Sequence, residues 1–314
     1  MHSPFNHGIE IDHEKLRQKL SKCTRSPHPS LLIVAGPSRA GKSSVIEWIE
    51  GHNDRAKAEL PQMGNSLDKG AVRIDSEFVK DFAPRLKKFN TDKFKGTAIS
   101  RHYEHNEENR QYYGQIRNAL VVEALRSGKS VILDDNCWDI LQPEETNVKH
   151  LIIAVRELCP DANIRAIGVI MHGDKFEGII DNDFAKDEIN VHDYNLAVRL
   201  AQYFFPIINS LAGWVDRTVI IDNSGTKLTD DSAPSPKIIA DYYRVPSAHQ
   251  SVANNTCEAH FEDGYALRNC EKSLQLLNPL KRSHNPMQQT DFDRESILAL
   301  IEARRKARAI QQGR

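Results

Sequence analysis

The chain has 314 residues, of which 39% are hydrophobic and 27% are charged, and its formal net charge is −1. This balance is typical of a globular protein, and it argues against an extended basic surface of the kind that binds nucleic acid in bulk. Five cysteines without a C-x-x-C pair argue against a disulfide framework or a zinc site, and no apolar run is long enough to cross a bilayer.

The first predicted elements are a helix, a strand and a second helix. Residues 9–23 have the spacing of a short amphipathic helix, and prolines within residues 26–30 end it. Residues 31–35 (LLIVA) form the continuous apolar run of a strand that is buried on both faces. A turn with glycines follows, and residues 44–50 return to helical spacing.

The middle of the chain continues the alternation after a polar stretch, residues 51–70, which is interpreted as a loop or insertion. Residues 72–74 form a short strand that ends at Asp75. Residues 112–126 have a helical pattern, and Gly128 is expected to stop that helix. The next buried strand is predicted at residues 130–133, with acidic residues directly after it.

The last third of the chain predicts helices at residues 150–158, 193–212 and 290–310, and strands at residues 164–171 and 217–221. A weak capping box, Thr290 with Asp293, is expected to start the last helix. Alternating strands and helices predict an α/β fold, a doubly wound and mostly parallel sheet with helices on both faces. We divide the chain into a helix and linker (1–29), the α/β domain (30–245) and a polar segment with a C-terminal helix (246–314).

A phosphate-binding motif lies between the first predicted strand and its helix, where residues 36–43 match G-x-x-x-x-G-K-[ST] in full. Its glycines allow the backbone N–H groups to approach phosphates, and the helix N-terminus adds positive partial charge. The lysine reaches the β- and γ-phosphates, and the serine hydroxyl ligates Mg²⁺. We therefore predict ATP and Mg²⁺ as cofactors, bound by Gly36, Pro37, Ser38, Arg39, Ala40, Gly41, Lys42, Ser43 and Ser44.

A kinase also needs a carboxylate beside the acceptor hydroxyl. Asp75 and Glu77 supply two candidates after a strand, although the same residues suit the start of a helix, with Asp75 as its cap. A GTPase would need a guanine-reading N-K-x-D motif, which the sequence lacks. Residues 222–225 superficially fit a separate GTPase motif, D-x-x-G, but they come late in the chain, after the fifth predicted strand.

In this order of motifs, residues 31–241 resemble the zeta toxins, which are P-loop kinases of toxin–antitoxin systems and related effectors. The matching pieces are the phosphate loop, a D-x-D-x-[FR]-like element at residues 74–80, a strand with an acidic end within residues 128–136, and a D-N-S-G-like turn at residues 222–225. The resemblance implies a fold of the P-loop kinase type. It also implies γ-phosphoryl transfer to a hydroxyl of a sugar nucleotide such as UDP-N-acetylglucosamine or of a dinucleotide such as NAD.

The resemblance further implies a toxin or effector that acts in the cytoplasm or after export into a host cell, together with an antitoxin or chaperone protein as partner. It makes Asp75 or Glu77 the catalytic base. It places Asp134 and Asn136 against the substrate, while Asp134 could instead order the metal with Ser43, and a solvated turn is the alternative for both residues. Lys42 stays the residue that neutralises the phosphates.

The zeta toxins carry two arginines after the fourth strand, whereas residues 171–197 contain none. We expect Lys175, Lys186 or, in the following helix, Arg199 to supply the missing charge, and we name Arg199 as catalytic. Arg101 and Arg110 are further alternatives. Arg101 and His102 are also assigned to the substrate, against the interpretation of their segment as a solvated polar helix.

Two other functions fit the sequence. A nucleoside or polynucleotide-end kinase would use the same phosphate loop with another acceptor. A non-catalytic ATP-binding module would explain the missing arginines, with the basic C-terminal helix as an interaction surface.

Overall fold

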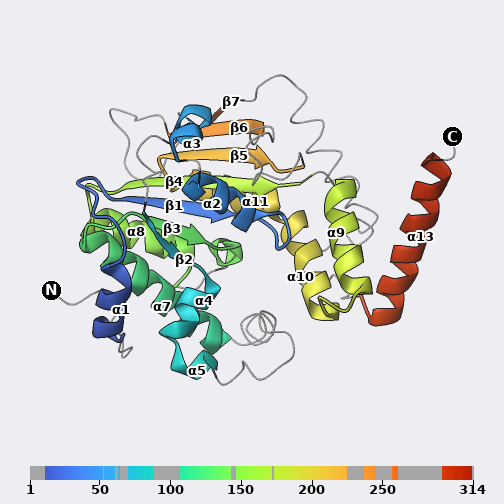
Figure 1. The fold of residues 1–314 in the computed structure, drawn as a ribbon, viewed down its shortest axis with the longest axis horizontal. Coiled ribbons are helices and arrows are strands. Elements are labelled where there is room, and N and C mark those ends of the chain that lie inside the picture. Colours follow the sequence, from blue (N-terminus) through green and yellow to red (C-terminus); the bar gives the residue numbers. More distant parts are fainter. Residues whose placement is uncertain are drawn as a thin grey trace.

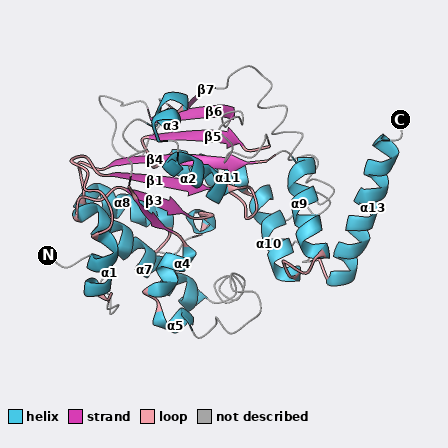
Figure 2. Ribbon diagram, viewed as in Figure 1, coloured by secondary structure: helices cyan, strands magenta, loops and turns pink. Residues whose placement is uncertain are grey.

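The computed structural model describes residues 11–51, 53–60, 63, 70–87, 107–142, 146–171, 173–224, 237–244, 257–260 and 292–312. Within them, seven strands form one sheet (Figures 1 and 2). In sheet order these are β2 (Val72–Ile74), β3 (Val131–Asp134), β1 (Ser30–Ala35), β4 (Asn163–Ile170), β5 (Arg217–Asp222), β6 (Lys237–Arg244) and β7 (Cys257–His260). The first five are parallel, and β6 and β7 are antiparallel additions at one edge. The prediction of a mostly parallel α/β sheet is confirmed.

The strand β1 is the centre of the parallel sheet and all six of its residues are buried. It pairs with β3 on one side and with β4 on the other, so that Val34 lies beside both Asp134 and Ile167. Because helices cover both faces of a parallel sheet, its strands are mostly apolar, which is why the five parallel strands could be recognised in the sequence.

Helices pack on both faces of the sheet. One face is covered by α2 (Lys42–Gly51) and α3 (Asn53–Glu59), whose apolar residues form a core with Leu32, Val34 and Ile132. The opposite face is covered by α1 (His13–Leu20), α7 (Glu107–Arg126), α8 (Val148–Leu158) and α11 (Phe204–Ala212). The carboxyl ends of the parallel strands are left accessible between these layers.

Three helices form a group of their own beside the sheet, toward the arrowheads of the parallel strands (Figure 1). They are α9 (Gly173–Ala185), α10 (Val191–Gln202) and the C-terminal α13 (Arg294–Gln312). Their shared core contains Phe184 of α9, Tyr194 of α10 and Ile297 of α13. The basic C-terminal helix is therefore packed against α9 and α10. No helix among the described residues is long and apolar enough to cross a membrane.

Several predicted elements differ from the structure. Residues 53–59 are the helix α3 and not a loop. The predicted helix over residues 193–212 is two helices, because Pro206 has no N–H to continue the ladder and would clash with the preceding turn. Asp293 alone accepts a hydrogen bond from the amide of Ser296 at the start of α13, whereas Thr290 lies outside the described residues.

The helix α4 (Ser76–Asp81) agrees with the alternative that Asp75 caps a helix, whereas α5 (Pro84–Lys87), η2 (Trp138–Leu141), α9 and the antiparallel strands β6 and β7 were not predicted. The predicted end of α7 is correct. Gly128 adopts a φ of 74°, its amide bonds to the carbonyl of Leu125, and the amide of Lys129 bonds to that of Ala124. This pair of bonds is the left-handed helix ending that favours glycine.

Candidate functional site

The phosphate loop joins β1 to α2 at the carboxyl edge of the sheet, in the strand–loop–helix context that the motif requires. Its two glycines are needed for different reasons. A Cβ on Gly36 would lie 2.4 Å from the carbonyl oxygen of Val169, so β4 leaves no room for a side chain there. Gly41 has a φ of 82°, in the left-handed region, and a Cβ on it would lie 2.1 Å from Nδ2 of Asn223.

Asn223 supports the loop from the end of β5. Its Nδ2 donates to the carbonyl oxygen of Ala40 at 3.1 Å, and its own amide bonds to the carbonyl of Ile170. The side chain is buried, so this contact fixes the loop against two neighbouring strands. The sequence indicates the D-N-S-G-like turn but not this role, and Gly225 lies outside the described residues.

Lys42 and Ser43 form the first turn of α2. Nζ of Lys42 donates to the carbonyl oxygen of Gly36 at 3.1 Å, which places the ammonium group over the loop. The first amides of a helix have no partner within it and carry positive partial charge, so this turn favours an anion. The loop thus combines backbone donors and one lysine at a single point.

Arg73 brings the predicted residues of three different segments together. Its Nη2 lies 2.9 Å from Oδ2 of Asp134 and donates to Oγ of Ser43 at 3.1 Å, while its Nε lies 3.5 Å from Oδ2 of Asp75. Arg73 pairs with Ile132 in the sheet, and side chains alternate along a strand. Arg73 and Asp134 therefore both point to the face that α2 covers.

The sequence did not identify Arg73, although a signal was present. It is the one charged residue in the short strand β2, where its neighbours Val72 and Ile74 are buried. A charge inside an apolar strand needs a partner, and here the partners are the oxygens at the ends of the neighbouring elements.

The contacts of Asp75 and Glu77 distinguish these two candidate bases. Asp75 caps α4 by accepting from the amide of Phe78 at 2.9 Å, as the helix-cap interpretation predicts, and its other oxygen faces Arg73. Glu77 has a side chain that is 66% exposed, and its carboxylate pairs with Lys80. Of the two predicted bases, Asp75 is the one that shares a cation with Asp134 and Ser43.

The residues after β3 form a rigid turn. Oδ1 of Asn136 accepts from the amide of Trp138 at 3.0 Å, so this predicted substrate residue supports the turn itself. Asp135 pairs with Arg117 at 3.0 Å, and Arg117 also pairs with Asp139 at 2.9 Å. The arginine is fully buried. None of these three charged residues was assigned a role from the sequence.

Burial raises the pKa values of two groups in and beside this network. The removal of water raises the pKa of Asp139 to about 6, because the attraction of Arg117, which it shares with Asp135, offsets only part of the cost. Burial also raises the pKa of Tyr113 well above its usual value, and the negative charge of Asp135 adds to the shift. The network is a buried support beneath the turn that carries Asp134.

The helix α9 contacts the phosphate loop from the other side. Nε of Arg39 lies 3.2 Å from Oδ2 of Asp183, and Lys175 donates to the carbonyl oxygen of Ser224 at 2.8 Å. Burial raises the pKa of Asp183, while Arg39 opposes the shift. Of the predicted substitutes for the missing arginines, Lys175 is thus bound to the turn after β5.

The other predicted basic residues that the structure describes lie on or directly after the helices α9, α10 and α7. Lys186 is exposed just after α9, and Arg199 is half-buried in the last turn of α10, the helix that leads into α11. Arg110 is half-buried near the start of α7. Arg101 and His102 lie outside the described residues. The catalytic assignment of Arg199 therefore stays a prediction.

The residues present fit a magnesium ion. Mg²⁺ prefers oxygen ligands, takes one or two from the protein and keeps waters or phosphate oxygens for the rest. Ser43 Oγ and Asp134 Oδ2 both contact one nitrogen of Arg73, so both oxygens already face a common cation. Within the part of the chain that the structure describes, no cluster of three or more His, Cys, Asp or Glu residues suggests a metal held by protein alone.

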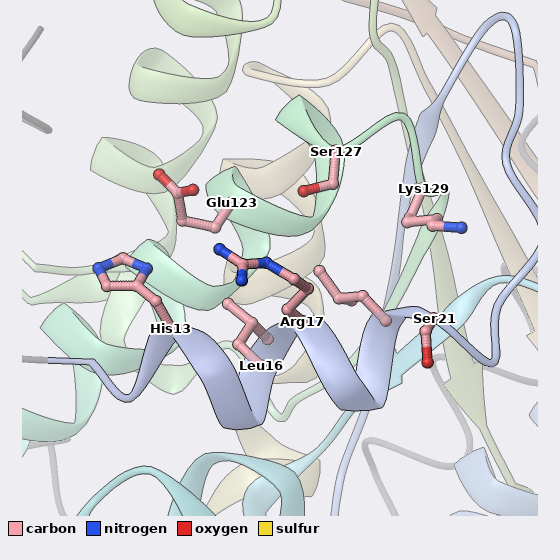
Figure 3. A pocket seen from close by; sticks show the side chains of 8 residues that line it. His13, Leu16, Arg17, Ser21, Glu123, Ser127 and Lys129 are labelled. Carbon is pink, nitrogen blue, oxygen red and sulfur yellow. The ribbon is translucent and has the colours of Figure 1, made fainter.

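A pocket of about 280 Å³ lies elsewhere, between α1 and the end of α7 (Figure 3). His13, Arg17 and Ser21 line it from α1 and the residue after it, and Glu123 and Ser127 approach from α7 and its end. Lys129, which also lines it, precedes β3, so the pocket lies toward the amino ends of the strands. It is separate from the site at the carboxyl edge.

No protein-family model and no curated protein matches the sequence. The structure is similar to one from the PezAT chromosomal toxin–antitoxin system of Streptococcus pneumoniae, with a TM-score of 0.44, 13% identity and coverage of 89% of this chain and 97% of that chain. It is also similar to the native AvrRxo1-ORF1:-ORF2 complex, with a TM-score of 0.41, 13% identity and coverage of 93% and 82%. A third similar structure is that of AvrRxo1-ORF1:-ORF2 with ATP. Its TM-score is 0.38 and its sequence identity is 14%, and the match covers 73% of this chain and 65% of that chain. The similarity is one of structure at low sequence identity.

Proposed function

We propose that this protein is an ATP-dependent kinase that transfers the γ-phosphoryl group to a hydroxyl of a small nucleotide-type molecule. The observation that carries the proposal is the convergence of Ser43, Asp75 and Asp134 on one cation beside a complete phosphate loop. A phosphate loop that served only to bind ATP would not need a second carboxylate at this place, whereas phosphoryl transfer uses one to order the acceptor.

Each residue of the site has its own role in the proposed reaction. The amides of the loop and Lys42 hold the β- and γ-phosphates and spread their charge. Ser43 and Asp134 would hold Mg²⁺, which supplies further neutralisation of the phosphates when it is bound. Asp75 orients the acceptor hydroxyl and accepts its proton as the new oxygen–phosphorus bond forms and the bond to the β-phosphate oxygen breaks. Glu77, paired with Lys80 and exposed, is the alternative base.

The proposal includes the class of acceptor and the biological role. The motif resemblance favours a sugar nucleotide or a dinucleotide as acceptor, and a toxin or effector that meets its substrate in the cytoplasm. An antitoxin or chaperone would then be its protein partner. Co-expression with each neighbouring gene tests this part, since one of them should suppress growth arrest and copurify with the chain.

The activity is tested by incubating purified protein with γ-labelled ATP and a metabolite extract, followed by identification of the labelled product. Lys42→Ala should abolish transfer and any growth arrest. Asp75→Asn should abolish transfer and leave ATP binding intact, and Glu77→Gln should retain most activity because its side chain is turned toward solvent. Toxicity that survives Lys42→Ala would count against the kinase, and loss of transfer only in the Glu77 variant would reassign the base.

A non-catalytic ATP-binding module is the second candidate. One observation favours it: residues 171–197 hold no arginine, and Lys175 is bound to the carbonyl of Ser224. Such a module would bind ATP with Mg²⁺ but label no acceptor in any extract. Detection of a single stoichiometric labelled product removes this alternative.

A further inference from the structure

Arg73 is the central cation of the site although the phosphate-loop motif does not contain it. Its Nη2 lies 2.9 Å from Oδ2 of Asp134 and 3.1 Å from Oγ of Ser43. One nitrogen thus holds both oxygen atoms to which the proposed function assigns the metal. The side chain of Arg73 is 27% exposed and that of Asp134 is 11% exposed, so water weakens this ion pair only in part.

We propose that Arg73 competes with the metal ion: its guanidinium keeps Ser43 and Asp134 together and must leave them before a divalent cation can bind. The inference rests on the proposed function. Both oxygens keep further lone pairs, so the competition is electrostatic: a metal about 2.1 Å from them would lie beside the guanidinium, and two cations on the same pair of oxygens repel each other. The same contacts that preform the metal site therefore also hinder its occupation.

Another carboxylate can accept the guanidinium of Arg73 when it leaves Ser43 and Asp134. Its Nε already lies 3.5 Å from Oδ2 of Asp75. Glu50 on α2 also senses its charge: burial raises the pKa of Glu50, and Arg73 opposes that shift. Rotation of the guanidinium away from Asp134 would leave it beside Asp75, so displacement does not leave the charge without a partner.

The competition is tested by the binding of Mn²⁺, a paramagnetic probe for magnesium sites, to the full chain saturated with a non-hydrolysable ATP analogue. Free Mn²⁺ is followed by electron paramagnetic resonance. Arg73→Met should bind Mn²⁺ about tenfold more tightly than wild type, the effect of losing one charge-assisted hydrogen bond from the competing cation. Arg73→Gln, which is neutral but polar, provides a second variant should the first fail to fold.

Arg156→Met is the matched control, because Arg156 also pairs with a carboxylate, Asp216 at 2.8 Å, but lies at the end of α8 and contacts neither proposed metal ligand. Tightening in the Arg73 variants alone supports the inference. Equal tightening in the Arg156 variant would mean that any lost positive charge suffices, and unchanged or weaker Mn²⁺ binding in the Arg73 variants would also overturn the competition. If wild-type protein does not bind the ATP analogue at all, the proposed function fails as well.

Discussion

The strongest test of the structure outside the phosphate loop is Arg304 of the C-terminal helix. Its guanidinium donates to Oδ1 of Asp181 and to the hydroxyl of Tyr194, both at 2.9 Å, and to Oε1 of Glu177 at 3.0 Å. The two carboxylate side chains are only 6% and 7% exposed. Arg304→Met keeps the apolar stem but leaves Asp181 buried without its cation, and leaves Glu177 with the more distant Arg308, at 3.9 Å. Loss of one partner from a buried ion pair costs about 3–5 kcal/mol.

The measurement is urea unfolding of the full chain, monitored by circular dichroism. Arg305→Met is the control, because Arg305 is the next residue on the same helix and is exposed. Surface ion pairs contribute about 0–1 kcal/mol, so the control should unfold close to wild type. Adding Glu177→Gln and Asp181→Asn to the Arg304 variant should recover part of the loss. Equal stability of the Arg304 and Arg305 variants would refute the buried network and with it the docking of α13.

Two further predictions concern the loop and its support. Gly41→Ala should weaken ATP binding at least tenfold, as measured by calorimetry. Its φ is left-handed, and the added Cβ would collide with Nδ2 of Asn223. The control Gly51→Ala has open space around its Cβ and should bind ATP like wild type. The raised pKa of Asp139 means that the folded state holds a proton that the unfolded chain loses first, so its contribution to stability is lost as pH rises from about 4 to about 6. Asp139→Asn should therefore gain stability relative to wild type over that range in urea unfolding at each pH, and parallel profiles would contradict the shift.

Local patterns were enough to predict the core of the fold and the phosphate loop. The five parallel strands are mostly apolar segments that need no distant partner to be recognised, and the motif of residues 36–43 encodes its own turn. The antiparallel strands β6 and β7 and short helices such as α3 were missed because they are partly polar and depend on packing rather than on periodicity. Pro206 indicated the break between α10 and α11, but the sequence prediction continued a single helix through it.

The site was predicted only where it lies in contiguous motifs. Ser43 and Asp134, predicted as metal ligands, both contact one nitrogen of Arg73, but Arg73 itself comes from an edge strand, and the link between Asn223 and Ala40 spans 183 residues. Arg117 was missed because a buried arginine in a helix has no local pattern. Contacts of this kind follow from sheet order, which a single sequence does not supply.

Most residues of the site also hold the fold, and this affects how they can be studied. Asp75 caps a helix, Asn223 holds the loop, and Asp134 neutralises Arg73. An alanine at any of them removes a structural bond together with a chemical group, so lost activity would not separate the two roles. Replacement of a carboxylate by its amide keeps the shape and an acceptor oxygen while it removes the charge. Only such variants, with unfolding measured beside binding, can assign chemistry to these residues.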